Sequence, residues 1–164
     1  MNEKAKTTVK DSVFVSLFEQ LENTLDLYKI LHPEDVSVTK EDIKNVTIQN
    51  IFTNADYNDL GFCVRNKLVI LVEAQSTWSY NIIIRSLLYL ADTWNREISR
   101  TNQDKYHSTK LRLSKPEFYV LYTGNRVNKP QWLSLSKDFF KEYNPFLDIN
   151  IKMLYGETGN DIIS

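Results

Sequence analysis

The stretch DLGFCVRNKLVILVEAQ, residues 59–75, decides the fold of this chain. Its halves DLGFCV and KLVILVEAQ have the apolar, β-branched character of strands, and Arg65-Asn66 between them offers a turn, so we predict a β-hairpin. Near the end of the second strand, Glu73 and Gln75 interrupt an apolar run. Polar groups in a buried strand are costly unless they are satisfied, so this pair calls for an explanation.

The segments on either side of the hairpin predict helices and further strands. Apolar residues recur at three- and four-residue spacing in two long segments, which indicates amphipathic helices. A short helix after Thr39, with Asp42 as a weak capping box, is also expected. Helices are predicted over 11–31, 76–100 (capped by Ser76, Thr77 or Ser79) and within 131–143, and strands over 46–52, 118–124 and 149–155. This order predicts an α/β fold, a mixed β-sheet flanked by α-helices.

The composition limits the classes of protein to consider. A chain of 164 residues with 42% hydrophobic residues is expected to fold as one domain over residues 1–164. The net charge of −1 gives no overall basic signature of nucleic-acid binding, although a local basic patch would suffice. No signal sequence or membrane-length apolar run is visible, so a cytoplasmic protein is expected. The chain stops soon after a strand-like segment, which suggests truncation at the C-terminus.

The expected hairpin register brings two carboxylates together. A turn centred on Asn66 would place Asp59 opposite Glu73, within one residue of register. Cross-strand neighbours lie about 5 Å apart at the β-carbon, so the two carboxylates would repel unless a cation lay between them. Mg²⁺ or Mn²⁺ would suit oxygen ligands, and Gln75 could orient a water molecule. In the alternative interpretation, Asp59 caps a turn, and Glu73 and Gln75 lie at an exposed end of the sheet.

Several segments resemble one known family. NDLGF (58–62), LVEAQSTWS (71–79) and RSLLYLADTW (85–94), together with DSVFVSLF (11–18) and PEFYVLYTG (116–124), are similar to the PD-(D/E)xK nuclease family transposases, also described as recombination-promoting nucleases. The resemblance implies a restriction-endonuclease-like core.

The resemblance also implies roles for three residues. Asp59 and Glu73 match the metal-binding acids, and Gln75 stands at the position of the usual lysine. Glutamine cannot supply the positive charge of that lysine. The family's proteins also tend to be longer than this chain.

Other residues carry weaker predictions. Asp11 is favoured as a helix cap, and as a metal ligand in the alternative interpretation. Arg85 and Tyr89 share a helix face; Arg85 would contact a phosphate or pair with Glu73 or another acid, and the two roles are compatible. The basic stretch with Lys105, Lys110, Arg112 and Lys115 is favoured as a solvated loop over a nucleic-acid contact. His32 and His107 have no motif around them, and neither is expected to bind a metal.

These expectations favour a Mg²⁺- or Mn²⁺-dependent endonuclease acting on DNA, linked to recombination or mobile elements. One alternative is a nuclease-like module that binds nucleic acid or a protein partner without cutting. Another is a component of a mobile-element or defence system whose activity needs a partner or a C-terminal part that this chain lacks. DNA is the expected partner, no membrane is expected, and the chain could act alone or as a homo-oligomer.

Overall fold

The computed structural model describes residues 17–18, 20–46, 59–74 and 77–156, and its centre is a mixed six-stranded sheet. The strand order is β1-β2-β3-β4-β6-β5. β3 runs parallel to β4, and β4 parallel to β6, while the remaining neighbours are antiparallel. The strands are β1 (Ile43–Val46), β2 (Asp59–Val64), β3 (Lys67–Ala74), β4 (Lys115–Tyr122), β5 (Trp132–Ser134) and β6 (Asn150–Tyr155).

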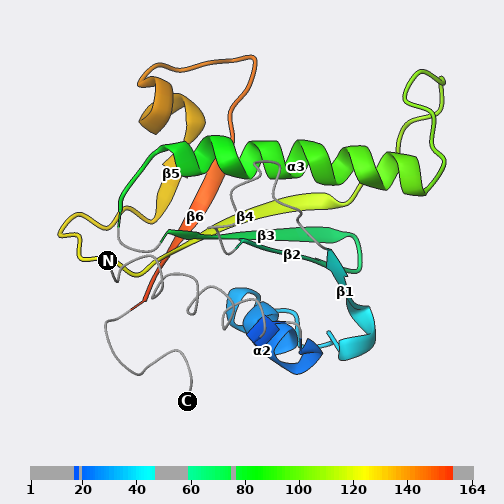
Figure 1. Ribbon diagram of the computed structural model, residues 1–164, viewed down its shortest axis with the longest axis horizontal. Coiled ribbons are helices and arrows are strands. Elements are labelled where there is room, and N and C mark those ends of the chain that lie inside the picture. Colours follow the sequence, from blue (N-terminus) through cyan, green and yellow to red (C-terminus); the bar gives the residue numbers. More distant parts are fainter. Residues whose placement is uncertain (1–16, 19, 47–58, 75–76, 157–164) are drawn as a thin grey trace, which may run out of the picture.

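Helices cover both faces of the sheet (Figure 1). The long helix α3 (Asn81–Arg100) and the π-helix η2 (Leu135–Phe140) lie on one face, and α2 (Leu21–Leu31) lies on the other. This is the α/β arrangement with a mixed sheet that the element order predicted. We call the two sides the α3 face and the α2 face.

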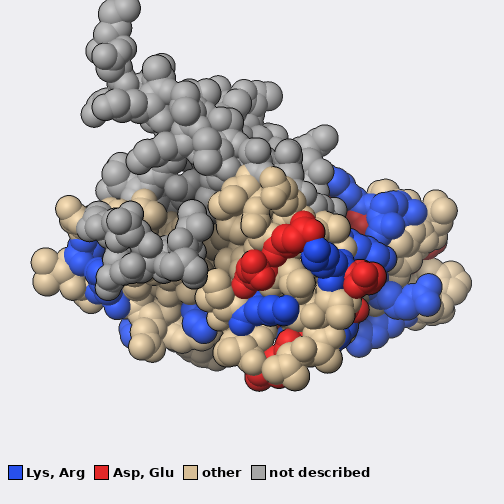
Figure 2. Space-filling view, turned by 90° about the horizontal axis from the view of Figure 1, so that it is seen from below, with Lys and Arg blue, Asp and Glu red and all other residues tan. Residues whose placement is uncertain are grey.

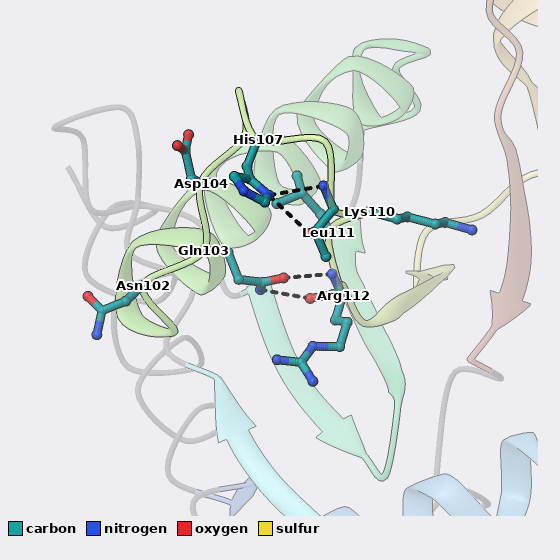
Figure 3. A pocket seen from close by; sticks show the side chains of 8 residues that line it. Asn102, Gln103, Asp104, His107, Lys110, Leu111 and Arg112 are labelled. Carbon is teal, nitrogen blue, oxygen red and sulfur yellow. Dashed lines mark hydrogen bonds between the residues drawn. The ribbon is translucent and has the colours of Figure 1, made fainter.

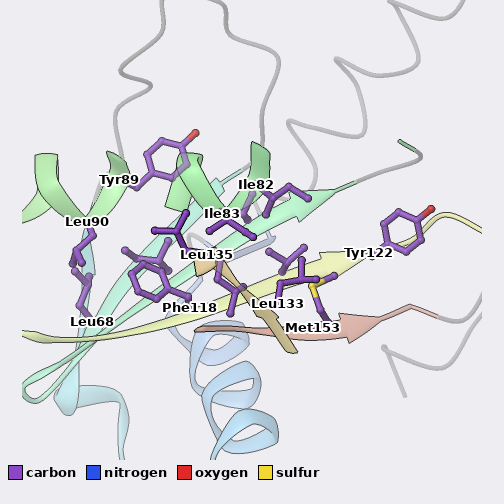
Figure 4. Close-up of a cluster of buried hydrophobic side chains, with 14 residues drawn as sticks. Leu68, Ile82, Ile83, Tyr89, Leu90, Phe118, Tyr122, Leu133, Leu135 and Met153 are labelled. Atoms are coloured by element: carbon purple, nitrogen blue, oxygen red, sulfur yellow. The ribbon is translucent and has the colours of Figure 1, made fainter. Parts of the chain in front are cut away.

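Each face has its own apolar core, as strand alternation requires. On the α3 face, Leu68, Ile70 and Val72 of β3 pack with Ile83 and Leu90 of α3 (Figure 4). On the α2 face, the intervening residues Val69 and Leu71 pack with Leu25 and Tyr28 of α2. β3 is therefore apolar on both sides, which explains its nearly continuous run of hydrophobic residues.

The predicted hairpin is confirmed, but its register differs by one residue. Arg65 adopts a left-handed conformation (φ 55°), and Arg65-Asn66 forms a two-residue loop between Val64 and Lys67. Asp59 consequently pairs with Val72, so the predicted pairing of Asp59 with Glu73 is wrong. The turn is centred between Arg65 and Asn66, and not on Asn66, which accounts for the shift.

Other predicted boundaries also move. α3 begins at Asn81 and not at residue 76, although the Ser79 hydroxyl does accept a hydrogen bond from the Asn81 backbone N–H (3.2 Å). β1 begins at Ile43, before the strand predicted over 46–52, and residues 47–52 lie outside the described part. The 3-10 turn η1 (Lys40–Asp42) has the expected capping box with Thr39. The short strand β5 was not predicted.

The described part of the chain contains no helix that is both long and apolar enough to cross a membrane. α3 is long, but charged residues such as Arg85, Asp92 and Arg96 divide its sequence.

Candidate functional site

Asp59 lies at the beginning of β2, beside the C-terminal end of β3, because the two strands are antiparallel. Its pairing with Val72 puts its side chain on the α3 face, where only 4% of that side chain is exposed. Arg85, near the N-terminal end of α3, reaches down to it. One guanidinium nitrogen, Nη2, donates to both carboxylate oxygens, at 3.0 Å to Oδ1 and 2.8 Å to Oδ2.

Tyr89 completes this group one helical turn further along α3. Burial, followed by the negative charge of Asp59 and a hydrogen bond with it, raises the pKa of Tyr89 to about 12. The phenol therefore stays protonated at neutral pH and can donate to the carboxylate. Burial alone would lower the pKa of Arg85, but the charge of Asp59 and its hydrogen bond outweigh burial and raise it. We call Asp59, Arg85 and Tyr89 the Asp59 cluster.

The Asp59 cluster settles part of what the sequence suggested. Arg85 and Tyr89 do share a face of the helix, and Arg85 does pair with an acid, which is Asp59. The predicted phosphate contact of Arg85 stays a prediction.

The remaining predicted ligands cannot be placed beside Asp59. Asp11, Gln75 and the side chain of Glu73 lie outside the described residues. The backbone of β3 reaches Ala74, and position 73 pairs with Leu121 of β4. A one-residue shift of register changes the face on which a strand residue lies, so the geometric reason for expecting Asp59 and Glu73 to face each other is lost.

Asp59 alone is a poor metal site. Divalent cations such as Mg²⁺ take several oxygen ligands, of which two or more usually come from the protein or its substrate. Among the described residues, no group of three or more His, Cys, Asp or Glu side chains is arranged to hold a metal ion. A metal centre at this end of the sheet would therefore need further ligands in addition to Asp59, such as Glu73, Gln75 or Asp11.

A second polar group, which the sequence did not reveal, lies on the α2 face. His32, just after α2, places Nε2 2.6 Å from Glu117 Oε2 on β4, and Nδ1 2.9 Å from Glu34 Oε1. The Tyr119 hydroxyl donates to the same Glu117 oxygen at 3.1 Å, and burial and the Glu117 charge raise the pKa of Tyr119. We call these four residues the His32 network. His32 and Glu117 lie far apart in the sequence, so no local motif could predict their contact.

The predicted basic stretch forms a folded loop at the C-terminal end of α3 (Figure 3). Gln103 holds the loop closed, since its side chain accepts from the Arg112 N–H at 2.7 Å and donates to the Arg112 carbonyl at 3.0 Å. A shallow pocket is lined by Gln103, His107, Lys110 and Arg112, among others. At 1.5 Å per helical residue, Arg100 lies roughly 22 Å along α3 from Arg85, so this loop is remote from the Asp59 cluster.

Comparison of the chain with protein-family models, with curated proteins and with solved structures finds no match in any of the three.

Proposed function

We propose that this protein is a metal-dependent endonuclease that hydrolyses phosphodiester bonds in DNA, and that Asp59 is one of its metal-binding carboxylates. The observation that supports the proposal best is the ion pair between Arg85 and the buried carboxylate of Asp59, where β2 begins and β3 ends, together with the E-x-Q sequence at residues 73–75. A PD-(D/E)xK-like restriction-endonuclease core, with a link to recombination or mobile elements, belongs to the same proposal.

The energetics of the pair favour a functional role. Desolvating two charges is expensive, and a buried ion pair often stabilises a protein less than apolar residues of similar volume would. Perturbed ionisable groups of this kind are enriched at functional sites. Arg85 and Tyr89 hold the Asp59 carboxylate in one orientation by hydrogen bonds.

The residues would divide the work as follows. Asp59 and Glu73 would hold Mg²⁺ or Mn²⁺, and Gln75 would orient the attacking water. The bound ion would supply charge stabilisation at the phosphate and lower the pKa of the water. Arg85 would keep Asp59 ionised and could also contact a phosphate oxygen.

A second function has a specific observation in its favour. Arg85 already neutralises Asp59, and the register pairs Asp59 with Val72 and not with position 73. Both features suit a domain that binds nucleic acid without cutting it, in which Asp59 and Arg85 serve only the structure of the site.

Plasmid nicking distinguishes the two functions. Supercoiled DNA would be incubated with the wild-type protein in Mg²⁺, in Mn²⁺ and in EDTA. The endonuclease proposal expects nicking with either metal and none in EDTA, with losses of at least about 100-fold for Asp59→Asn and Glu73→Gln and a smaller loss for Gln75→Ala.

Asp92→Asn is the matched control for this experiment. Asp92 also pairs with an arginine of α3, Arg96, but Asp92 lies further along the helix and is more exposed. The Asp92→Asn variant should nick DNA at the wild-type rate. A folded wild-type protein that binds DNA but nicks none with either metal would rule out the endonuclease and leave the binding domain.

A further inference from the structure

Aromatic side chains gather at the C-terminal ends of β3, β4 and β6. Trp78, between β3 and α3, lies edge-on to Tyr122 at the end of β4, with ring centroids 5.2 Å apart. Tyr122 is in turn edge-on to Tyr155 at the end of β6, at 6.2 Å. Tyr80 lies 6.0 Å from Trp78 and is 36% exposed. These four rings form a row across one end of the sheet.

Two cations from the β4–β5 connection lie on this row. The guanidinium carbon of Arg126 is 3.8 Å from the centroid of the Trp78 ring, and the Arg126 Nε–H donates to the Asn128 carbonyl at 2.7 Å. The Lys129 ammonium lies 5.5 Å from the centroid of Tyr155. Both distances are within the range of a cation–π interaction. We call Trp78, Tyr80, Arg126 and Lys129 the aromatic–cation surface.

The connection that carries these cations is fixed to β6. The Tyr155 hydroxyl donates to the Pro130 carbonyl at 2.6 Å, and the Met153 N–H donates to the Gln131 carbonyl at 2.9 Å. The Gly156 N–H also donates to the Tyr122 carbonyl at 3.1 Å. Arg126 and Lys129 are therefore presented from an anchored loop, with Lys129 exposed and Arg126 partly exposed.

The charge of this surface has one sign along the segments that form it. Residues 118–137 include Arg126, Lys129 and Lys137 but no Asp or Glu, and residues 74–91 include Arg85 and likewise no Asp or Glu. A ligand that suits the surface would carry negative charge and flat rings. Nucleotides supply both, because bases stack on aromatic and guanidinium planes and phosphates attract Lys and Arg.

We propose that the aromatic–cation surface binds an unpaired nucleic-acid strand. A base stacks either on Tyr80 or on the face of the Arg126 guanidinium that points away from Trp78. The neighbouring phosphate lies near Lys129. A duplex hides the faces of its bases in the stack, so it can offer this surface only its phosphates. An unpaired strand should therefore bind more tightly than a duplex of the same length.

The surface lies at the same end of the sheet as Asp59, because β2 begins beside the C-terminal ends of β3 and β4. In the strand register, Ala74 pairs with Tyr122, two residues beyond the Val72 that pairs with Asp59. Two strand residues span about 6.6 Å. This inference deepens the proposed function, since it names the form of substrate that would reach the site, and it rests on nucleic acid being that substrate.

Binding measured in EDTA tests the inference without any cleavage. A short fluorescein-labelled oligodeoxyuridylate would be titrated with protein and followed by anisotropy, beside an oligouridylate and a DNA duplex of equal length. We expect the unpaired strands to bind at least about ten-fold more tightly than the duplex. Because the two strands differ only in the 2′-hydroxyl, a preference for one of them identifies DNA or RNA as the strand, and equal affinity shows that the surface binds bases without regard to the sugar.

Variants test whether the strand binds at this surface. Arg126→Ala should weaken binding of the unpaired strand about ten-fold. Arg126→Lys should keep only part of the wild-type affinity, because lysine has no plane for stacking. Lys110→Ala is the control, since Lys110 is an exposed cation on the loop at the other end of α3. Melting temperatures would confirm that all variants fold.

Two results would overturn the inference. One is equal affinity of the wild-type protein for strand and duplex, or no binding of either. The other is an equal loss in Arg126→Ala and Lys110→Ala, which would indicate diffuse attraction. Neither result depends on nicking, so a protein that binds unpaired strands through Arg126 but never nicks DNA would remove only the endonuclease proposal.

Discussion

The two faces of the sheet hold their buried polar side chains in different ways. On the α2 face, the His32 network joins four side chains, and Lys67 lies 3.8 Å from Glu117 as well. On the α3 face, the Asp59 carboxylate depends on Arg85 and Tyr89 beside an apolar cluster. A network with several donors tolerates the loss of one, whereas removing the cation from a buried ion pair is more costly.

The surroundings of the His32 network and of the Asp59 cluster also differ. Figure 2, which views the molecule from the α2 side, shows Lys and Arg side chains interspersed with Asp and Glu. Pairs such as Lys40 with Glu22 and Arg65 with Asp35 join α2 and its following loop to neighbouring segments. This face is suited to holding a helix on the sheet. The Asp59 cluster, at the ends of the strands, is better suited to a ligand.

Removing Arg85 should have the largest effect on stability. Arg85→Met leaves the carboxylate of Asp59 buried without its cation, and breaking a buried pair in this way costs about 3–5 kcal/mol. Urea denaturation of the variant and the wild type measures the difference. Adding Asp59→Leu to Arg85→Met should recover much of the loss, because no charge is then left behind. A loss below about 1 kcal/mol in Arg85→Met would mean that water solvates Asp59.

His32→Gln on the other face should cost less, about 1 kcal/mol. Glu117 keeps its hydrogen bond from Tyr119 and its proximity to Lys67, so no charge is stranded. His107→Gln is the control, because His107 is exposed and bonds only within its own loop among the described residues. Urea denaturation that gave His32→Gln as large an effect as Arg85→Met would remove the contrast between the two faces.

The difference between the faces also explains what the sequence could predict. The apolar, β-branched run of KLVILVEA and the spacing of apolar residues in α3 are local patterns, and they predicted the hairpin, the long helix and the mixed sheet. The hairpin register depended on whether the turn is centred on Asn66 or between Arg65 and Asn66. A loop made of Arg65 and Asn66 alone gives the observed pairing, and this half-residue difference decides which residues of β3 share a face with Asp59.

Long-range contacts were the other part that the sequence could not give. The sequence predicted that Arg85 could pair with an acid but did not identify Asp59 as that acid. Helix periodicity shows on which face of the helix Arg85 lies, and it does not show which residue the side chain meets. The His32–Glu117 contact joins residues on separate elements, as does Arg126 over Trp78. For the contact of Arg126 with Trp78, the sequence did hold a useful signal. The segment that follows β4 has cations and no carboxylates, which indicates a basic surface.

Alkaline pH should act on the Asp59 cluster through Tyr89. A phenol in the unfolded chain has a pKa near 10.0, whereas that of folded Tyr89 is about 12. The folded state therefore keeps a proton that the unfolded state loses, so this contribution to stability is complete below pH 10 and is lost as the pH rises toward 12.

The variant Tyr89→Phe isolates that contribution. It should lose stability less steeply than the wild type between pH 10 and 12, as measured by urea denaturation at several pH values. Tyr106→Phe is the control, because Tyr106 is 89% exposed and should follow the wild-type profile. Identical slopes for Tyr89→Phe and the wild type would show that the pKa of Tyr89 is not raised in the folded protein.

The smallest effect is expected for the Asp92–Arg96 pair, which has the chemistry of Asp59–Arg85 but not its burial. The two side chains are one turn apart on α3 and are 30% and 40% exposed, compared with 4% and 20% for Asp59 and Arg85. Water screens such a pair, so a double-mutant cycle of Asp92→Asn and Arg96→Met should give a coupling of about 0.3–0.5 kcal/mol that decreases with salt. The same cycle on Asp59→Asn and Arg85→Met should give a several-fold larger coupling with little salt dependence, because the carboxylate is shielded from solvent. If urea denaturation gives equal couplings for the two pairs, burial does not distinguish Asp59, and the energetic reason for placing the functional site there is lost.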